Sequence, residues 1–167
     1  MKRFALLLCV FLLYSCGYRF VGSYSGIGKN IKRVYVAKVK NETGEPNLAS
    51  RMRSYMIRQL NLDSRVDVAH TPKKADATLR IAIVSYSVDP SSFSSNGIAS
   101  MYRCTIVALF WLKGAGKVYE KGIKVEAYRD YRASDKVSAT ELARKVISSK
   151  VLKDLASRID DELFVGF

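Results

Sequence analysis

Cys16 is the residue whose setting in the sequence predicts the most definite chemistry. Lys2 and Arg3 precede an apolar run from Phe4 to Tyr14, and Ser15 stands directly before the cysteine. A basic start, a short apolar stretch and a small residue before a cleavage point are typical of a secretory signal peptide. The cysteine and the aliphatic residue three positions before it match a bacterial lipobox. Cleavage after Ser15 would leave Cys16 to carry a diacylglycerol and an N-acyl chain such as palmitate.

Lipidation at Cys16 predicts a membrane-anchored protein. The apolar run before it is shorter than the roughly 20 residues that a spanning helix needs. Stable anchoring takes about two acyl chains, which a bacterial lipoprotein carries. Gly17 stands where an aspartate commonly retains lipoproteins at the inner membrane, and this favours the periplasmic side of the outer membrane. An uncleaved anchor, or a plain signal peptide followed by an incidental cysteine, is the alternative.

The other reactive side chains do not form a pattern typical of catalysis. After loss of the signal peptide, Cys104 is the one cysteine besides Cys16, and His70 is the one histidine. A catalytic thiol needs a nearby base, whereas Cys104 lies in an apolar, strand-like run that is typical of a buried thiol. No cysteine or histidine cluster has metal-ligand spacing. The sequence therefore predicts no enzyme, no metal and no cofactor.

The charge balance predicts an anionic partner. The chain has 28 Lys and Arg against 15 Asp and Glu, a formal net charge of +13. Such a balance is often found in nucleic-acid-binding proteins, but export argues against nucleic acid. Phosphorylated glycolipids and anionic lipid headgroups are the abundant polyanions at an outer membrane, and lysine and arginine bind phosphates by charge and hydrogen bonds. A basic surface that serves solubility is the alternative.

The first half of the exported chain predicts a strand, a helix and a second, short strand. Residues 31–39 are rich in valine and tyrosine, which favours a strand. Apolar residues recur at three- and four-residue spacing over 47–61, which predicts an amphipathic helix after a turn at 41–46. A short edge strand is expected at 66–69.

The second half predicts three longer strands and a final helix. The strands are expected at 77–88, 102–112 and 117–131. A Ser-rich exposed loop at 89–97 separates the first two, and a tight turn at 113–116 joins the last two as a hairpin. Ser138 and Glu141 have the spacing of a capping box, which predicts a long amphipathic helix from there to the end.

This order of elements predicts an α+β fold. Two helices packed on one face of a mostly antiparallel sheet of four to five strands, a two-layer sandwich, is the economical arrangement. The expected organisation is a signal peptide at 1–15, a lipidated tether at 16–30 and a single domain at 31–167. That domain is long enough to bury a core.

Three short motifs follow one another along the chain. They are Cys16-Gly17-Tyr18-Arg19-Phe20, Asn41-Glu42-Thr43 at the end of the first strand, and Ala75-Asp76-Ala77 at the opening of a later strand. In this order they resemble the lipopolysaccharide-assembly lipoproteins of the LptE family. The resemblance implies an outer-membrane lipoprotein that plugs the β-barrel LptD and helps to place lipopolysaccharide in the outer leaflet. It also implies two helices on a four-stranded sheet.

Four lysines near the predicted hairpin are the candidates for contact with lipopolysaccharide phosphates. They are Lys113, Lys117, Lys121 and Lys124. An exposed polar hairpin end without a ligand is the alternative. An uncovered sheet face with Tyr86, Tyr128 and Tyr131 is expected to meet the polar inner wall of the barrel, because tyrosine is favoured at protein interfaces.

A second function stays open from the sequence. A free-standing periplasmic lipoprotein that binds an anionic envelope lipid or polymer would have the same signal peptide, the same cysteine and the same basic surface. Recovery of a barrel partner in mild detergent distinguishes the two functions.

Overall fold

The computed structural model describes residues 31–165, except 115–116, 119–121 and 135. The predicted signal peptide, Cys16 and the predicted tether lie outside the described residues. In chain order the elements are β1 (Arg33–Val36), β2 (Lys40–Asn41), α2 (Leu48–Leu62), β3 (Asp67–Val68), the 3-10 turn η1 (Pro72–Lys74), β4 (Ala77–Phe93), β5 (Ala99–Gly114), β6 (Lys117–Val118), β7 (Ile123–Arg132) and α3 (Val137–Val165).

A mixed sheet of seven strands is the frame of this α+β domain. β1 pairs in parallel with β3 on one side and with β4 on the other, and β2 continues the parallel pairing along β4. β5 lies antiparallel to β4, and β6 and β7 both pair antiparallel with the other side of β5. The predicted sheet, mostly antiparallel with four to five strands, is therefore wrong. Its β1 side is parallel because α2 returns the chain between β1 and β3, and parallel strands need such a crossover.

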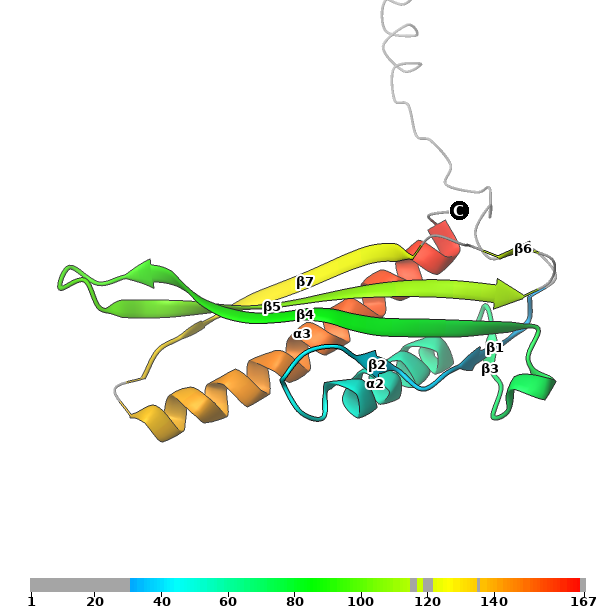
Figure 1. The fold of residues 1–167 in the computed structure, drawn as a ribbon, viewed down its shortest axis with the longest axis horizontal. Coiled ribbons are helices and arrows are strands. Elements are labelled where there is room, and N and C mark those ends of the chain that lie inside the picture. The colour runs from blue at the N-terminus through cyan, green and yellow to red at the C-terminus, as the bar shows by residue number, and fades with distance from the viewer. Residues whose placement is uncertain (1–30, 115–116, 119–121, 135, 166–167) are drawn as a thin grey trace, which may run out of the picture.

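The hairpin of β4 and β5 gives the domain its elongated shape (Figure 1). β4 continues to Phe93 and β5 begins at Ala99, so most of the predicted loop at 89–97 is strand. Pro90 lies opposite Tyr102, and the register shifts directly after it. Proline has no N–H to donate, and within sheets it is confined to edges and bulges. Pairing with β5 thus overrides the loop-like composition of this segment.

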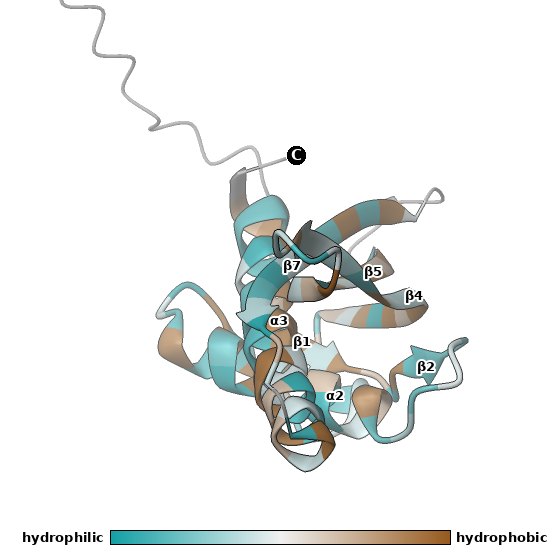
Figure 2. Ribbon diagram, turned by 90° about the vertical axis from the view of Figure 1, so that its left-hand side faces the viewer, coloured by the Kyte–Doolittle hydropathy of each residue, from teal (hydrophilic) through white to brown (hydrophobic). Residues whose placement is uncertain are grey.

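The two helices have different neighbours. α3 packs across β7 and β5, whereas α2 packs against α3 and lies beside β1, β2 and β3 (Figures 1 and 2). α2 confirms the helix predicted at 47–61, and its buried residues are Leu48, Met52, Met56 and Leu60. Neither helix in the described part of the chain combines the length and the apolarity needed to span a membrane.

α3 begins differently from the expectation. It starts at Val137, so Ser138 lies within its first turn. The Glu141 carboxylate accepts a hydrogen bond from Arg144 Nε at 3.0 Å. The predicted capping box of Ser138 and Glu141 is therefore wrong, because the Lys136 carbonyl already accepts from the N–H groups of Ala139 and Thr140, and Ser138 lies inside the helix rather than at its N-cap.

Asp76 ties the opening of β4 to β1. Its Oδ2 accepts hydrogen bonds from the backbone N–H groups of Lys32 at 3.0 Å and Arg33 at 2.8 Å. The bond from Lys32, followed by that from Arg33, lowers the pKa of Asp76 below its ordinary value. β5 passes so close here that a Cβ on Gly114 would lie 2.4 Å from the carbonyl oxygen of Asp76. The Ala75-Asp76-Ala77 motif thus closes one end of the sheet.

Candidate functional site

Neither of the two described helices covers the face of the sheet that points away from α3 (Figure 2). Buried residues alternate with more exposed ones along the long strands, which identifies the side chains on this outer face. On β5 and β7 they are Arg103, Thr105, Val107, Leu109, Trp111, Lys113, Lys124, Glu126, Tyr128 and Asp130. A mixture of apolar and charged side chains makes this face suitable for a polar partner surface.

The structure places two of the four predicted lysines on the outer face. Lys113 and Lys124 are both exposed there, opposite Thr78 and Leu109 respectively. Their positions on the sheet are about four residues apart along β5, which corresponds to about 13 Å. Lys117 lies in β6, but its side chain is outside the described set, and Lys121 is outside the described residues. The structure thus puts Lys113 and Lys124 on one face without joining them in one cluster.

Lys113 instead belongs to a basic groove, which we call the Trp111 groove. The groove has a volume of about 600 Å³ and lies where the chain between β1 and β2 runs beside β4 and β5. Its basic side chains are Lys38, Lys40, Arg80 and Lys113, and Trp111 contributes its aromatic surface. Sequence reasoning found only Lys113. The strand alternation could have placed Arg80 and Trp111 on one face, but the register that brings them opposite each other is visible only in the structure.

The tyrosines predicted for an uncovered face divide between the two faces. Tyr128 lies on the outer face, where it is 51% exposed, and the guanidinium of Arg103 lies 4.4 Å from its ring centroid. Tyr131 is buried on the opposite face, and the Tyr86 hydroxyl accepts a hydrogen bond from Arg144 on α3. The expectation is therefore wrong for Tyr86 and Tyr131, because each belongs to the α3 side of the sheet.

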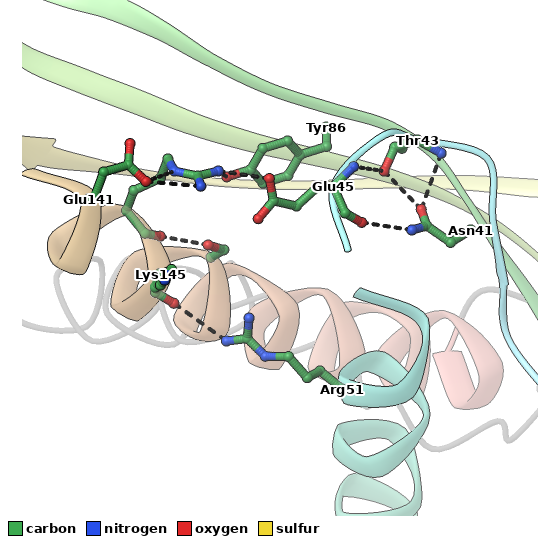
Figure 3. A network of polar contacts seen from close by, with 9 residues as sticks. Asn41, Thr43, Glu45, Arg51, Tyr86, Glu141 and Lys145 are labelled. Atoms are coloured by element: carbon green, nitrogen blue, oxygen red, sulfur yellow. Dashed lines mark hydrogen bonds and ion pairs between the residues drawn. The ribbon is translucent and has the colours of Figure 1, made fainter. Parts of the chain in front are cut away.

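A polar network joins the loop before α2 to α3 and β4 (Figure 3). Arg144 on α3 donates from Nη1 to Glu45 Oε2 at 2.7 Å and to the Tyr86 hydroxyl at 3.1 Å. The Glu45 carboxylate, followed by Tyr86, raises the pKa of the Arg144 guanidinium above its ordinary value. The side chains of Arg144 and Glu45 are mostly buried. Arg144 therefore connects three separate parts of the fold.

The Asn41-Glu42-Thr43 motif shapes the loop that supplies Glu45. Asn41 Oδ1 accepts from the backbone N–H of Thr43 at 3.1 Å and from its hydroxyl at 2.8 Å. Asn41 Nδ2 donates to the Glu45 carbonyl at 2.8 Å (Figure 3). These bonds bend the chain after β2 in the manner of an Asx turn. The motif thus positions Glu45 toward Arg144, and the turn predicted at 41–46 is confirmed.

A buried carboxylate lies between the two helices. The side chain of Asp160 on α3 is 4% exposed, and its Oδ2 accepts from Gln59 Nε2 at 3.2 Å and lies 3.8 Å from Arg65 Nη2. Its Oδ1 has no hydrogen-bond partner among the described residues. Burial raises the pKa of Asp160 from 3.8 to about 6. The neighbouring Asp63 has the opposite shift, because its hydrogen bond with Arg65 lowers its pKa.

The two side chains considered for catalysis, those of Cys104 and His70, lie in different environments. Cys104 is fully buried in β5, and burial raises the pKa of its thiol. His70 is exposed between β3 and η1. In the described part of the chain, no group of three or more His, Cys, Asp or Glu residues could hold a metal ion.

The tip of the β4–β5 hairpin is a hydrogen-bonded turn with an exposed apolar side chain on each side. The Ser94 N–H donates to the Ile98 carbonyl at 2.8 Å, and Gly97 has φ 75°, a backbone conformation open to glycine. Phe93 and Ile98 flank this turn and are 62% and 68% exposed. The tip lies at the end of the sheet opposite the Trp111 groove.

Solved structures of bacterial lipoproteins have the same fold. Lipoprotein B of Nitrosomonas europaea is 17% identical with a TM-score of 0.56, over 86% of this chain and 87% of that one. Rare lipoprotein B of Shewanella oneidensis is 17% identical with a TM-score of 0.54, over 77% of this chain and 92% of that one. A lipoprotein of Caulobacter crescentus is 13% identical with a TM-score of 0.50, over 75% and 87%. No curated protein sequence matches the chain.

A match to a protein-family model identifies the family of this chain. The model described as "LptE: Lipopolysaccharide-assembly" matches residues 31–163, which is nearly all of the described domain. Proteins of this family are envelope lipoproteins that act in lipopolysaccharide assembly without a cofactor. The two motifs inside the domain, at 41–43 and 75–77, lie within the matched residues. The chain therefore belongs to the LptE family of lipopolysaccharide-assembly proteins.

Proposed function

We propose that this protein is an outer-membrane lipoprotein that plugs the β-barrel LptD and takes part in inserting lipopolysaccharide into the outer leaflet. In this proposal, residues 1–15 are removed as a signal peptide, Cys16 is lipidated and 16–30 form a tether. Residues 31–167 form the domain that enters the barrel from the periplasmic side. The family match over 31–163 is the observation that carries the proposal.

The outer face of the sheet supports binding inside a barrel. Wide barrels leave a polar lumen that has to be filled. The outer face offers charged side chains at both ends, such as Lys124 and the ion pair of Arg103 with Asp130 at 2.8 Å. Between them lie the half-buried side chains of Val107 and Leu109, while Tyr128 is exposed. Such a mixed surface can pair with polar wall residues and still exclude water.

Copurification tests the barrel partnership. A tagged full-length protein, extracted in mild detergent, is expected to recover an outer-membrane barrel in a ratio of one to one. Charge reversal on the outer face, Lys124→Glu with Arg103→Glu, should reduce that recovery at least tenfold. Reversal at Lys73 and Lys74, which are exposed in η1 and belong to none of the strands that form the outer face, is the matched control. A monomer recovered alone from native membranes contradicts the proposal.

Reversal of Lys113, Lys117, Lys121 and Lys124 to glutamate tests their contact with lipopolysaccharide. Exposed ionic contacts are each worth about 0.2–1 kcal/mol, so losing four should weaken binding about fourfold or more. Lys73, Lys74, Lys136 and Lys150 give a control with the same change in net charge. Binding to purified lipopolysaccharide is measured for both variants, with circular dichroism to verify the fold. Equal affinities exclude the four lysines as a binding site.

The Trp111 groove is the observation that favours the second function, a free-standing lipoprotein that binds an anionic envelope lipid or polymer. Its basic side chains lie together without a barrel being needed to complete them. The same copurification decides between the functions, because this alternative predicts a soluble-domain monomer on a lipid anchor with no stoichiometric barrel.

A further inference from the structure

The walls of the Trp111 groove are fixed by the backbone. The segment between β1 and β2 is held along β4 by a hydrogen bond from the Ala37 N–H to the Leu79 carbonyl at 2.9 Å. A second bond joins the Glu42 N–H to the Ile83 carbonyl at 2.9 Å, and Lys40 is in register with Ala82. A wall held at both ends makes the groove a defined feature of the fold.

Trp111 provides an aromatic surface in the groove. It lies opposite Arg80 in the β4–β5 register, so the two side chains share the outer face. A Cβ at Gly122 would lie 2.7 Å from Cζ2 of the indole, which shows that the ring extends over the start of β7 where only glycine leaves room. Trp111 is only half-buried, although tryptophan is among the side chains with the largest apolar area.

The charge of the groove is not neutralised from within. Lys40 pairs with Glu42 at 2.8 Å. Lys38, Arg80 and Lys113 are exposed and have no ion pair or side-chain hydrogen bond within the parts of the chain that the structure describes. At the other end of the outer face, by contrast, Arg103 is paired with Asp130. The groove therefore combines three uncompensated cations with an accessible indole.

This combination has the chemistry of a lipid-headgroup site. Lysine and arginine bind phosphate by charge and hydrogen bonds. Tryptophan with lysine or arginine is the usual anchoring set at the headgroup level of a bilayer, and basic pockets bind anionic lipid headgroups. A volume of about 600 Å³ is that of a small-molecule site, which suits one phosphoglyceride headgroup better than an acylated, phosphorylated disaccharide.

We infer that the Trp111 groove binds the headgroup of an anionic glycerophospholipid, with its phosphate among Lys38, Arg80 and Lys113 and its glycerol and first methylenes across the indole. This site rests on the second function proposed above and deepens it, because it names the class of lipid that the groove binds; it does not depend on a barrel partner. It gives the domain a second, reversible contact with the periplasmic leaflet at the end of the sheet opposite the hairpin tip.

Trp111 is the single tryptophan of the chain, so its fluorescence reports on the groove directly. The full chain in neutral detergent is titrated with dihexanoyl phosphatidylglycerol, and a saturable blue shift is expected. Dihexanoyl phosphatidylcholine should give a response at least tenfold weaker. No saturable shift with phosphatidylglycerol, or equal responses to the two lipids, overturns the inference.

Two further ligands identify the source of the phosphate. Inorganic phosphate that saturates the same signal at an equal concentration shows a bare anion site and overturns the inference. Purified lipopolysaccharide that binds through Trp111 more tightly than phosphatidylglycerol assigns the groove to glycolipid and likewise overturns it. Weaker responses to both support a phospholipid headgroup. None of these outcomes bears on copurification of the barrel.

Charge variants test the residues. Lys38→Glu with Arg80→Glu should weaken phosphatidylglycerol binding at least tenfold, whereas Lys73→Glu with Lys74→Glu should change it less than twofold. The milder Arg80→Gln keeps the test valid if the double reversal misfolds, and it should weaken binding about threefold. Unchanged affinity in a folded Arg80→Gln and a folded double variant contradicts the assignment.

Discussion

Replacing Arg144 with methionine is expected to lower the free energy of unfolding by about 2–4 kcal/mol. Methionine keeps much of the arginine's length but leaves the mostly buried Glu45 carboxylate and the Tyr86 hydroxyl without their shared donor. Removing one partner of a buried ion pair costs about 3–5 kcal/mol, and the residual exposure of Glu45 lowers that figure. Denaturant unfolding of the purified domain, followed by circular dichroism, measures the loss.

Arg129→Met is the matched control. Arg129 pairs with Asp154 at 2.5 Å between β7 and α3, but the two side chains are 48% and 34% exposed. An exposed ion pair is worth about 0–1 kcal/mol, so this variant should unfold with nearly the wild-type free energy. If Arg144→Met and Arg129→Met lose the same free energy of unfolding, the burial of Glu45 adds nothing to the cost of removing its partner. The double variant Arg144→Met with Glu45→Gln should recover part of the loss, because it removes the unpaired charge.

The Arg144 network and the contacts of Asp76 show that the sequence motifs inside the domain have a structural role. The resemblance to LptE depended on short motifs, and each motif inside the domain proves to fix a junction between elements. Asp76 joins β4 to β1, and the Asn41 turn presents Glu45 to α3. These polar contacts cross between segments that lie far apart in the sequence. A motif can therefore identify the fold without any of its side chains touching a ligand.

The middle of β5 and the two helices could be predicted because their signals are local. The apolar run at 102–112 and the apolar stripe of α2 are properties of neighbouring residues. The extension of β4 through 89–93 was missed because a Ser-rich segment with Pro90 is typical of loops. In the structure its pairing partner on β5 supplies the hydrogen bonds, and a register shift accommodates the proline.

The mixed sheet and the Trp111 groove could not be predicted in the same way. A strand, a helix and a short strand at 31–39, 47–61 and 66–69 already suggest a crossover and hence parallel pairing. The several consecutive strands expected after the first helix, with one tight hairpin, favoured an antiparallel sheet instead. Lys38 and Arg80 come together only through the pairing of three strands, and a shift of one residue would move Arg80 into the core. A candidate site that depends on the pairing register of strands therefore cannot be predicted from one sequence alone.

Asp160→Asn is expected to stabilise the domain at pH 7 by up to about 3 kcal/mol. The rise of the Asp160 pKa from 3.8 to about 6 means that the folded state holds this proton more tightly than the unfolded state. Stability is therefore lost as the pH rises from about 4 to about 6, and the loss equivalent to this rise is about 3 kcal/mol. The physical cause is desolvation of a carboxylate whose Oδ1 has no hydrogen-bond partner among the described residues. Asparagine keeps the acceptor for Gln59 and carries no charge.

The pH dependence separates this effect from a simple change in packing. Unfolding free energies of the wild type and of Asp160→Asn, measured from pH 4 to pH 8, should converge near pH 4 and differ most above pH 6. The pKa of Asp63 is lowered, so the stability that its ionised form contributes is lost at a pH below that window. Asp161→Asn, at the exposed neighbouring position, should follow the wild type within about 0.5 kcal/mol. A difference between Asp160→Asn and the wild type that is the same at pH 4 and pH 7 would mean that Asp160 is not buried as an anion.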